Sequence, residues 1–130
     1  MSTEQNKEIV RRASGALGRG DLEGFLADAA DDVTFNVMWA AIPPVHGKRK
    51  VLKMLNNTLG GRIQGSAIVM TIENLIAEGD YVAEQARGKS RTVDGRDYNN
   101  IYCRVWRIVD GKIQSLHEYL DTELARMLVD

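Results

Sequence analysis

Apolar and polar positions follow two different spacings along the chain, a helical one in the first half and a strand-like one in the second. Over residues 3–18, apolar side chains recur at every third or fourth position, which predicts an amphipathic helix. Asp21 is a suitable N-cap for a second, short helix, and a third helix is predicted from Gly47 to about Leu59. Residues 33–39 are rich in β-branched and aromatic side chains and predict a strand.

Four further strands are predicted after the third helix, because apolar and polar residues alternate between turn signals. Their ranges are 66–77, 81–93, 98–109 and 112–120. Asp-Gly between alternating segments is a strong hairpin signal, so we expect an antiparallel meander. The helices are too few to cover both faces of such a sheet. We therefore expect an α+β domain with a curved, mostly antiparallel sheet, helices packed on its concave face, and a cone-shaped cavity between them.

Composition adds several exclusions to this picture. The 130 residues predict a single domain over residues 1–130. With 17 Lys and Arg against 18 Asp and Glu, the net charge of -1 gives no reason to expect nucleic acid or a membrane surface as partner. One cysteine, Cys103, no signal-like segment in residues 1–12 and no apolar run near ~18 residues lead us to expect a cytoplasmic protein. No metal-ligand spacing and no glycine-rich phosphate loop occur, so we expect no metal and no cofactor.

Several short motifs, in this order of elements, resemble a known family. The motifs are Gly20-Asp21-Leu22-Glu23, Asp31-Asp32-Val33-Thr34-Phe35, Val45-His46-Gly47, the segment from Gly95 to Tyr102, Asp110-Gly111-Lys112-Ile113 and Glu118-Tyr119-Leu120-Asp121. Over nearly the whole chain they are similar to the SnoaL-like, ketosteroid isomerase-related branch of the nuclear transport factor two superfamily, and also to limonene-epoxide hydrolases. The resemblance implies a cystatin-like, cone-shaped α+β barrel that hosts many different reactions.

The resemblance also implies a catalytic carboxylate. The acid/base aspartate of SnoaL-like cyclases and the water-activating carboxylate of limonene-epoxide hydrolases fall at Glu118. An arginine and an aspartate of the hydrolases fall at Gln85 and Arg87, and their water-holding tyrosine and asparagine fall at Val37 and Trp39. The oxyanion tyrosine that ketosteroid isomerases carry on the first helix has no counterpart here.

The residues themselves also favour Glu118 as the centre of the site. Leu116, Glu118 and Leu120 share one face of the last predicted strand, so the carboxylate lies between two apolar side chains. Burial of this kind raises the pKa of a carboxyl toward the range of a general acid or base. The alternative is a buried ion-pair partner for an arginine.

The strand that faces Glu118 depends on the turn at residues 110–111. A two-residue turn sets Glu118 opposite Cys103, whereas a three-residue loop with a bulge sets it opposite Tyr102, with Asn100 and Arg104 on the same face. Composition favours the first register because it gives a drier pocket. The family pattern favours the second, and we follow it.

The candidate site then combines catalytic and ligand-contacting groups. The catalytic candidates are Glu118 for proton transfer, with Tyr102 and Arg87 to stabilise an oxygen. The substrate-binding candidates are Trp39, Gln85, Asn100, Leu116 and Leu120. Arg87 reads equally well as a solvated strand arginine, and Trp39 as a core residue.

These residues predict a small-molecule-binding domain. The first reading is a cofactor-independent acid–base enzyme, an isomerase, lyase or cyclase that acts on a small hydrophobic carbonyl or polyketide-like compound. The alternatives are epoxide hydrolysis with Glu118 as the base, and a non-catalytic binder. We also expect a homodimer through the outer face of the sheet, where this register places apolar and aromatic residues: Ile101, Cys103, Val105, His117 and Tyr119.

Overall fold

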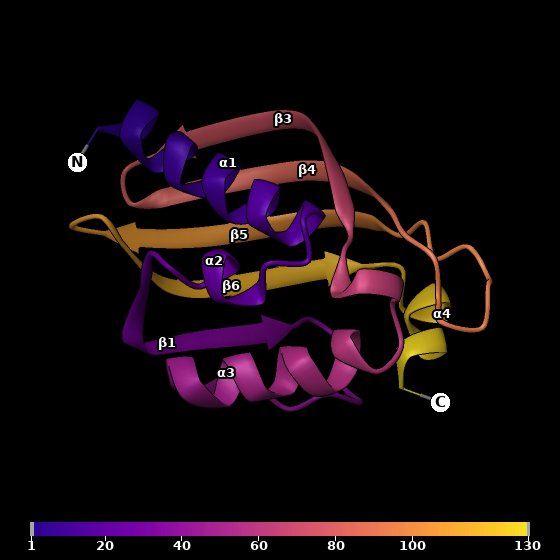
Figure 1. The fold of residues 1–130 in the computed structure, drawn as a ribbon. Coiled ribbons are helices and arrows are strands. Elements are labelled where there is room, and N and C mark those ends of the chain that lie inside the picture. The colour runs from indigo at the N-terminus through magenta and orange to yellow at the C-terminus, as the bar shows by residue number, and fades with distance from the viewer. Residues whose placement is uncertain (1, 130) are drawn as a thin grey trace.

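The computed structural model describes residues 2–129, and within them six strands form one curved sheet (Figure 1). The strands are β1 (Ala29–Val37), β2 (Val45–His46), β3 (Val69–Glu78), β4 (Tyr81–Lys89), β5 (Ile101–Val109) and β6 (Lys112–Leu120). They lie side by side in the order β2-β1-β6-β5-β4-β3. Strands β3 to β6 form the expected antiparallel meander, and β1 joins it by pairing in parallel with β6.

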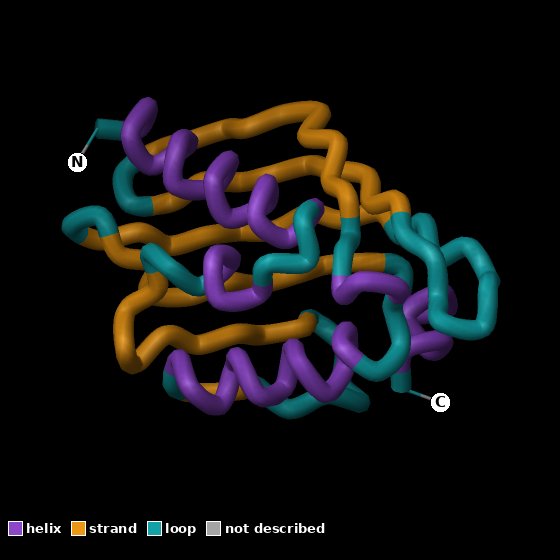
Figure 2. The backbone as a smooth tube through the Cα atoms, in the orientation of Figure 1, coloured by secondary structure: helices purple, strands orange, loops and turns teal. Residues whose placement is uncertain are grey.

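Helices cover one face of this sheet (Figures 1 and 2). They are α1 (Thr3–Gly18), α2 (Leu22–Phe25), α3 (Lys48–Leu55) and α4 (Thr122–Ala125). A capping box of Ser2 and Gln5 begins α1, which packs against β3 and β4, while α3 packs against β1. A π-helical turn, Asn56–Gly60, extends α3, and short 3-10 turns occur at Gln64–Ser66 and Arg126–Leu128. The α+β class and the helix-covered curved sheet are therefore confirmed.

Strand ends differ most from the sequence expectation around the loop between β4 and β5. Strand β4 ends at Lys89 instead of residue 93, because Thr92 bonds to Asp94 and to the backbone of Arg96 and folds the loop on itself. The Asp94-Gly95 pair therefore lies in a longer loop and not in a two-residue hairpin. Strand β1 begins at Ala29, four residues early, because the exposed Asp31 and Asp32 interrupt the apolar pattern near its start.

The register of β5 and β6 corrects the expected turn. Asp110 and Gly111 both have positive φ, 49° and 77°, and form a two-residue turn of the kind that favours Asp-Gly. Further along, Gln114 is an extra residue in β6 and shifts the pairing by one. Glu118 therefore lies opposite Arg104, and the preferred partner Tyr102 was wrong. The even-numbered residues of β5 nevertheless share the face of Glu118, as expected, because the bulge in β6 shifts the pairing by one residue.

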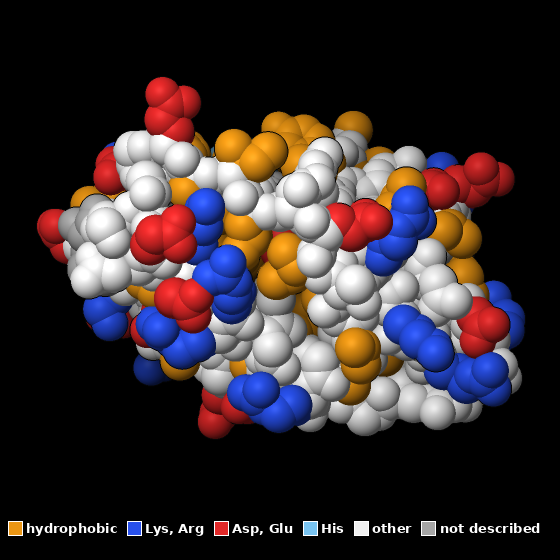
Figure 3. Space-filling model, turned by 90° about the horizontal axis from the view of Figure 1, so that it is seen from above, with side chains coloured by type: hydrophobic (Ala, Val, Ile, Leu, Met, Phe, Trp, Pro, Cys, Tyr) orange, Lys and Arg blue, Asp and Glu red, His pale blue; other side chains and the backbone are white. Residues whose placement is uncertain are grey.

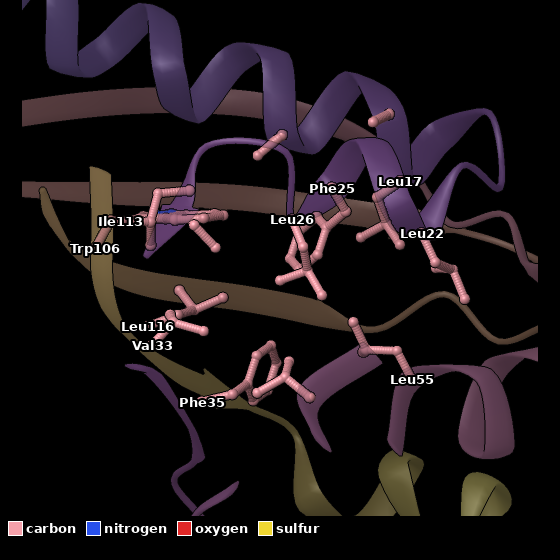
Figure 4. Close-up of a cluster of buried hydrophobic side chains, with 14 of the residues drawn as sticks. Leu17, Leu22, Phe25, Leu26, Val33, Phe35, Leu55, Trp106, Ile113 and Leu116 are labelled. Carbon is pink, nitrogen blue, oxygen red and sulfur yellow. The ribbon is translucent and has the colours of Figure 1, made fainter. Parts of the chain in front are cut away.

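The core is filled most tightly where α1 and α2 meet the middle of the sheet. Phe25 packs edge-on against Trp106 with ring centroids 5.9 Å apart, and Leu116 and Ile113 close the space beside them (Figure 4). Seen from the β3 side, acidic, basic and apolar side chains are interspersed, as the near-zero net charge suggests (Figure 3). Among the described helices, none combines the length and apolar character that a membrane crossing requires.

Candidate active site

A row of three charged side chains crosses the concave face of the sheet. Glu84 of β4 lies directly opposite Arg104 of β5, which lies opposite Glu118 of β6. Arg104 donates from Nε to Glu118 Oε2 at 2.9 Å, and its Nη1 lies 3.6 Å from Glu84 Oε1. The side chains of Glu84 and Arg104 are 0% and 2% exposed, and that of Glu118 is 12% exposed. Two carboxylates therefore share one buried guanidinium.

The alternation of each strand explains why these charges point inward. Residues two positions away on both sides are apolar or aromatic and face the helices. These flanking residues are Val82 and Ala86, Tyr102 and Trp106, and Leu116 and Leu120. A strand that buries its flanking residues must also bury the residue between them, and three opposite positions then bring the charges together.

Both oxygens of Glu84 are held by groups outside this row. Ser14 of α1 donates to Oε2 at 2.6 Å, and the Trp106 indole nitrogen donates to Oε1 at 3.1 Å. These two bonds hold the Glu84 side chain in one position in the core, outside the cavity wall.

Glu118 is bound on one side only. Within residues 2–129, no donor is bonded to its second oxygen, Oε1. Burial raises the pKa of the Glu118 carboxyl above its ordinary value, and the Arg104 guanidinium opposes this rise without cancelling it. The negative charge of Glu84 adds to the rise. A carboxyl in this state keeps its proton to higher pH than an ordinary glutamate does.

Glu118 lies in the wall of a cavity of about 250 Å³. The sheet, α3 with its π-helical turn, and the C-terminal turn enclose it. Its lining consists of Leu17, Phe25, Phe35, Val37, Trp39, Ile42, Met54, Leu55, Thr58, Leu59, Ile68, Tyr98, Tyr102, Arg104, Glu118, Leu120, Ala125, Leu128 and Val129. The C-terminal turn and the loop after β1 come together where the Arg126 guanidinium lies 5.6 Å from the Trp39 ring. The cavity is therefore largely apolar, with its polar groups gathered around Glu118.

Two tyrosine hydroxyls supply the other polar atoms near Glu118. Tyr98 and Tyr102 are 1% and 7% exposed, and burial raises the pKa of both hydroxyls. Both therefore remain protonated at neutral pH and can donate. The Arg104 guanidinium lies 5.0 Å from the Tyr102 ring centre and fixes that ring in place. Asn100 donates to the Tyr98 oxygen at 2.9 Å, and the Tyr102 hydroxyl is also hydrogen-bonded to Tyr98, so the two hydroxyls form a linked pair.

The structure brings four of the eight sequence-predicted site residues into the cavity wall. Glu118, Tyr102 and Leu120 come from the sheet, and Trp39 comes from the loop after β1. Their catalytic and binding roles stay predictions, but these four share one cavity as the sequence reading requires.

Gln85 and Arg87 do not belong to this group, and their expected placement was wrong. Both are exposed on the outer face, where Gln85 accepts a bond from Asn74 at 3.0 Å and Arg87 pairs with Glu73 at 3.4 Å. On β4 the even-numbered residues are buried, so the odd-numbered ones face away from the helices. A one-residue difference in the long β4–β5 loop is enough to exchange the two faces.

Asn100 and Leu116 also lie outside the cavity wall, which corrects their assignment as substrate-binding residues. Asn100 is 0% exposed and fully used: besides Tyr98, it bonds the backbone of Ile101 and both backbone groups of Asp121. Leu116 is 2% exposed and packs beside Trp106 in the closed part of the core, two residues along the strand from Glu118 (Figure 4).

Sequence reasoning missed Glu84 and the C-terminal turn. The signal for Glu84 was present, since a single carboxylate stands between Val82 and Ala86 in an alternating strand. The short helix α4 carried no such signal, because four residues are too few for a helical period. Among residues 2–129, no three His, Cys, Asp or Glu side chains are grouped as a metal site requires.

Comparison with known proteins gives this geometry a family. The sequence model of the SnoaL-like domain matches residues 10–116. A comparison with curated proteins finds no match. Solved structures give likeness of fold at low sequence identity.

An NTF2-like protein of unknown function from Burkholderia pseudomallei is 23% identical, with all of both chains covered and a TM-score of 0.83. An LEH-like epoxide hydrolase from M. tuberculosis is 20% identical, with 98% of this chain and 91% of that one covered and a TM-score of 0.78. A putative SnoaL-like polyketide cyclase from Jannaschia is 15% identical, with 98% and 92% covered and a TM-score of 0.80. Together, the match over residues 10–116 and the shared cone-shaped fold show that the chain belongs to the SnoaL-like domain family.

Proposed function

We propose that the cavity binds a small hydrophobic carbonyl compound and that Glu118 transfers a proton on it, as a cofactor-independent isomerase or cyclase does. One observation carries this proposal. Glu118 presents an unbonded oxygen in the wall of an apolar cavity, while its other oxygen is held by Arg104. A carboxylate with only a structural role has no need of a free oxygen facing a cavity.

The proposed step begins with Glu118 as a carboxylate. Its Oε1 accepts a proton from the carbon next to the carbonyl, so the C–H bond breaks and its electron pair forms an enolate. The linked hydroxyls of Tyr98 and Tyr102 stabilise the carbonyl oxygen by hydrogen bonding as its negative charge grows. Glu118 then returns the proton to another carbon, which completes an isomerisation, or to the oxygen formed when the enolate closes a ring.

The shape and charge of the cavity support a neutral, compact ligand. On the order of a dozen non-hydrogen atoms fill a space of this size at the packing density of protein interiors. The polar row has one cation and two carboxylates, so it offers no spare positive charge for an anion. The remaining lining is mostly aliphatic and aromatic, with Thr58 as its one other hydroxyl group.

Water activation by Glu118 is a second candidate. The same free oxygen suits a general base acting on a water, and the fold likeness to an LEH-like epoxide hydrolase supports it. Val37 and Trp39 occupy the first-strand side of the cavity, where they offer carbon and an indole N–H. A water there would be held chiefly by Glu118 and the tyrosines, which is why proton transfer to and from carbon is the better-supported reaction.

The proposal is tested by deuterium incorporation next to a carbonyl. A panel of small cyclic and aryl ketones is incubated in heavy water with the wild-type protein and with Glu118→Gln, and exchange is followed by proton NMR. We expect exchange with the wild type and none above background with Glu118→Gln, which keeps the shape of the side chain. Glu123→Gln, an exposed carboxylate on α4, is the matched control and should exchange like the wild type.

Two outcomes separate the remaining functions. Ligands that bind without exchange, and epoxides that are hydrated only when Glu118 is intact, would move the assignment to the hydrolase. Binding with neither reaction would leave a ligand-binding protein. Equal exchange by wild type and Glu118→Gln would remove Glu118 from the reaction.

A further inference from the structure

The buried row contains one guanidinium and two carboxylates, and the two carboxylates are held differently. Arg104 is hydrogen-bonded to Glu118 at 2.9 Å, but its Nη1 lies 3.6 Å from Glu84, beyond hydrogen-bond distance. That Nη1 is buried and has no hydrogen-bond partner within residues 2–129. Glu84 therefore acts on Arg104 mainly through its charge, while its own bonds go to Ser14 and Trp106.

Proton transfer by Glu118 would leave the buried Arg104 without its bonded anion, and Glu84 supplies a second one. Each time Glu118 is protonated, Arg104 loses its bonded anion while it stays in the core. A buried cation without a counter-charge is strongly unfavourable, so Arg104 alone would hold Glu118 in its charged form. A second, permanent carboxylate on the other side of the guanidinium removes this constraint.

We propose that Glu84 is a positioning residue, the permanent counter-ion of Arg104 that leaves Glu118 free to take up and release a proton. The positioning role in catalysis rests on the proposed function, whereas the titration that tests it needs no substrate. Glu84 does not line the cavity and touches no ligand; it acts through Arg104. Its bonds to Ser14 on α1 and Trp106 on β5 hold it in place beside Arg104.

Within residues 2–129, Arg104 and Glu118 are the charged side chains that line the cavity. Strand β5 contributes Arg104 and the Tyr102 hydroxyl to the cavity wall, and the loop before β5 contributes the Tyr98 hydroxyl. Glu84 of β4 lies outside the wall, next to Arg104. The other elements around the cavity face it with uncharged side chains, among them Phe25 from α2, Val37 from β1, Thr58 from the π-helical turn and Leu128 from the C-terminal turn. Removing the charge of Glu84 therefore leaves Arg104 as the main charged neighbour of Glu118.

The experiment is a pH titration of the Glu118 carboxyl carbon by NMR in the wild type, Glu84→Gln and Ser14→Ala. Glu84→Gln keeps the size of the side chain and removes its charge, so the apparent pKa of Glu118 should fall by about one unit or more. Ser14→Ala removes one bond to Glu84 and keeps the charge, so Glu118 should titrate nearly as in the wild type. An unchanged or higher Glu118 titration in Glu84→Gln overturns the proposal.

A measurement on the wild type alone covers the case in which Glu84→Gln does not fold. The carboxyl carbon of Glu84 should keep its ionised shift over the whole pH range in which Glu118 titrates. If Glu84 takes up the proton before Glu118, or the two share it, Glu84 is not a permanent counter-ion. The proposed function is tested separately: it fails if Glu118→Gln exchanges deuterium as fast as the wild type. That result would not change the Glu118 titration expected in the wild type and in Glu84→Gln.

Discussion

Arg104 reaches Glu118 through a single N–H, from Nε to Oε2 at 2.9 Å, although the two residues lie directly opposite on neighbouring strands. A bidentate arginine would occupy both oxygens of the carboxylate. Here the guanidinium is turned so that Nη1 approaches Glu84 and Nη2 approaches the Met70 sulfur at 3.7 Å. The sharing of Arg104 thus explains both its own burial and the free oxygen of Glu118.

Arg104→Met should destabilise the fold strongly at neutral pH, because it leaves Glu84 and Glu118 buried without their cation. Breaking a buried ion pair by removing one partner costs about 3–5 kcal/mol. The loss should be smaller near pH 5, where Glu118 can take up a proton. Urea unfolding at both pH values measures this. Arg107→Met, an exposed arginine on the same strand, should change little; equal stability of the two variants would show that the buried row is not held by charge.

The raised pKa of Glu118 predicts how stability depends on pH. Because burial raises this pKa in the folded state, the native protein binds a proton more tightly than the unfolded chain does. The free energy of unfolding should therefore fall as pH rises from about 4.3, the ordinary value, through the folded pKa, by about 1.4 kcal/mol per pH unit between the two. Above the folded pKa this contribution is constant.

Glu118→Gln removes this pH dependence, so the stability difference between wild type and variant isolates it. Chemical unfolding at closely spaced pH values gives the curve. Glu78→Gln, at an exposed end of β3, should leave the wild-type slope intact. If the wild type instead becomes more stable relative to Glu118→Gln as pH rises, Arg104 lowers the pKa of Glu118 in the folded protein below its ordinary value.

The sequence predicted which face of β6 is buried, but not what lies opposite Glu118. Alternation of Leu116, Glu118 and Leu120 carries the first kind of information, because a strand has a strict period of two. The bulge at Gln114 has no local signal: it sits in a polar stretch where one extra residue changes no pattern. Which residue of β5 meets Glu118 depends on that single insertion.

Strand β4 shows the opposite situation, in which the local pattern was more reliable than motif spacing. The family comparison ran across a long loop and selected Gln85 and Arg87. The alternation of Val82, Glu84 and Ala86 gives the face that the structure has. Spacing across an irregular loop is uncertain by at least one residue, and one residue exchanges inside and outside.

Tyr102→Phe should slow the reaction with little loss of affinity. The hydroxyl is proposed to bind the carbonyl oxygen most strongly when that oxygen becomes negative, so its removal should lower the exchange rate by about 10²-fold. The ring keeps its contacts with Arg104 and with the cavity, so ligand binding measured by calorimetry should be nearly unchanged. Tyr81→Phe, on the outer face, is the matched control. A loss confined to affinity would make Tyr102 a binding group only.

Asn100→Ala should loosen the C-terminal turn that closes the cavity. The side chain bonds the Tyr98 hydroxyl and both backbone groups of Asp121, which begins α4. Leaving these buried groups unpaired should cost about 1–3 kcal/mol. Hydrogen exchange should become faster over residues 121–129 and stay at the wild-type rate in α1. Uniform acceleration over the whole chain would instead show a general role in the core.

We propose that the outer face of the sheet forms a homodimer. Ile101 and Tyr119 are 50% and 46% exposed there, and the half-buried Cys103 lies opposite Tyr119 and two residues from Ile101, so apolar side chains face away from the helices. Sedimentation velocity should give twice the chain mass for the wild type. Ile101→Asp should give the single-chain mass, because it places a charge in the proposed apolar contact. Val93→Asp changes an apolar residue of 61% exposure in the β4–β5 loop and should leave the dimer intact. A wild-type mass of one chain at every concentration would contradict the proposal, and dissociation by both variants would place the contact elsewhere.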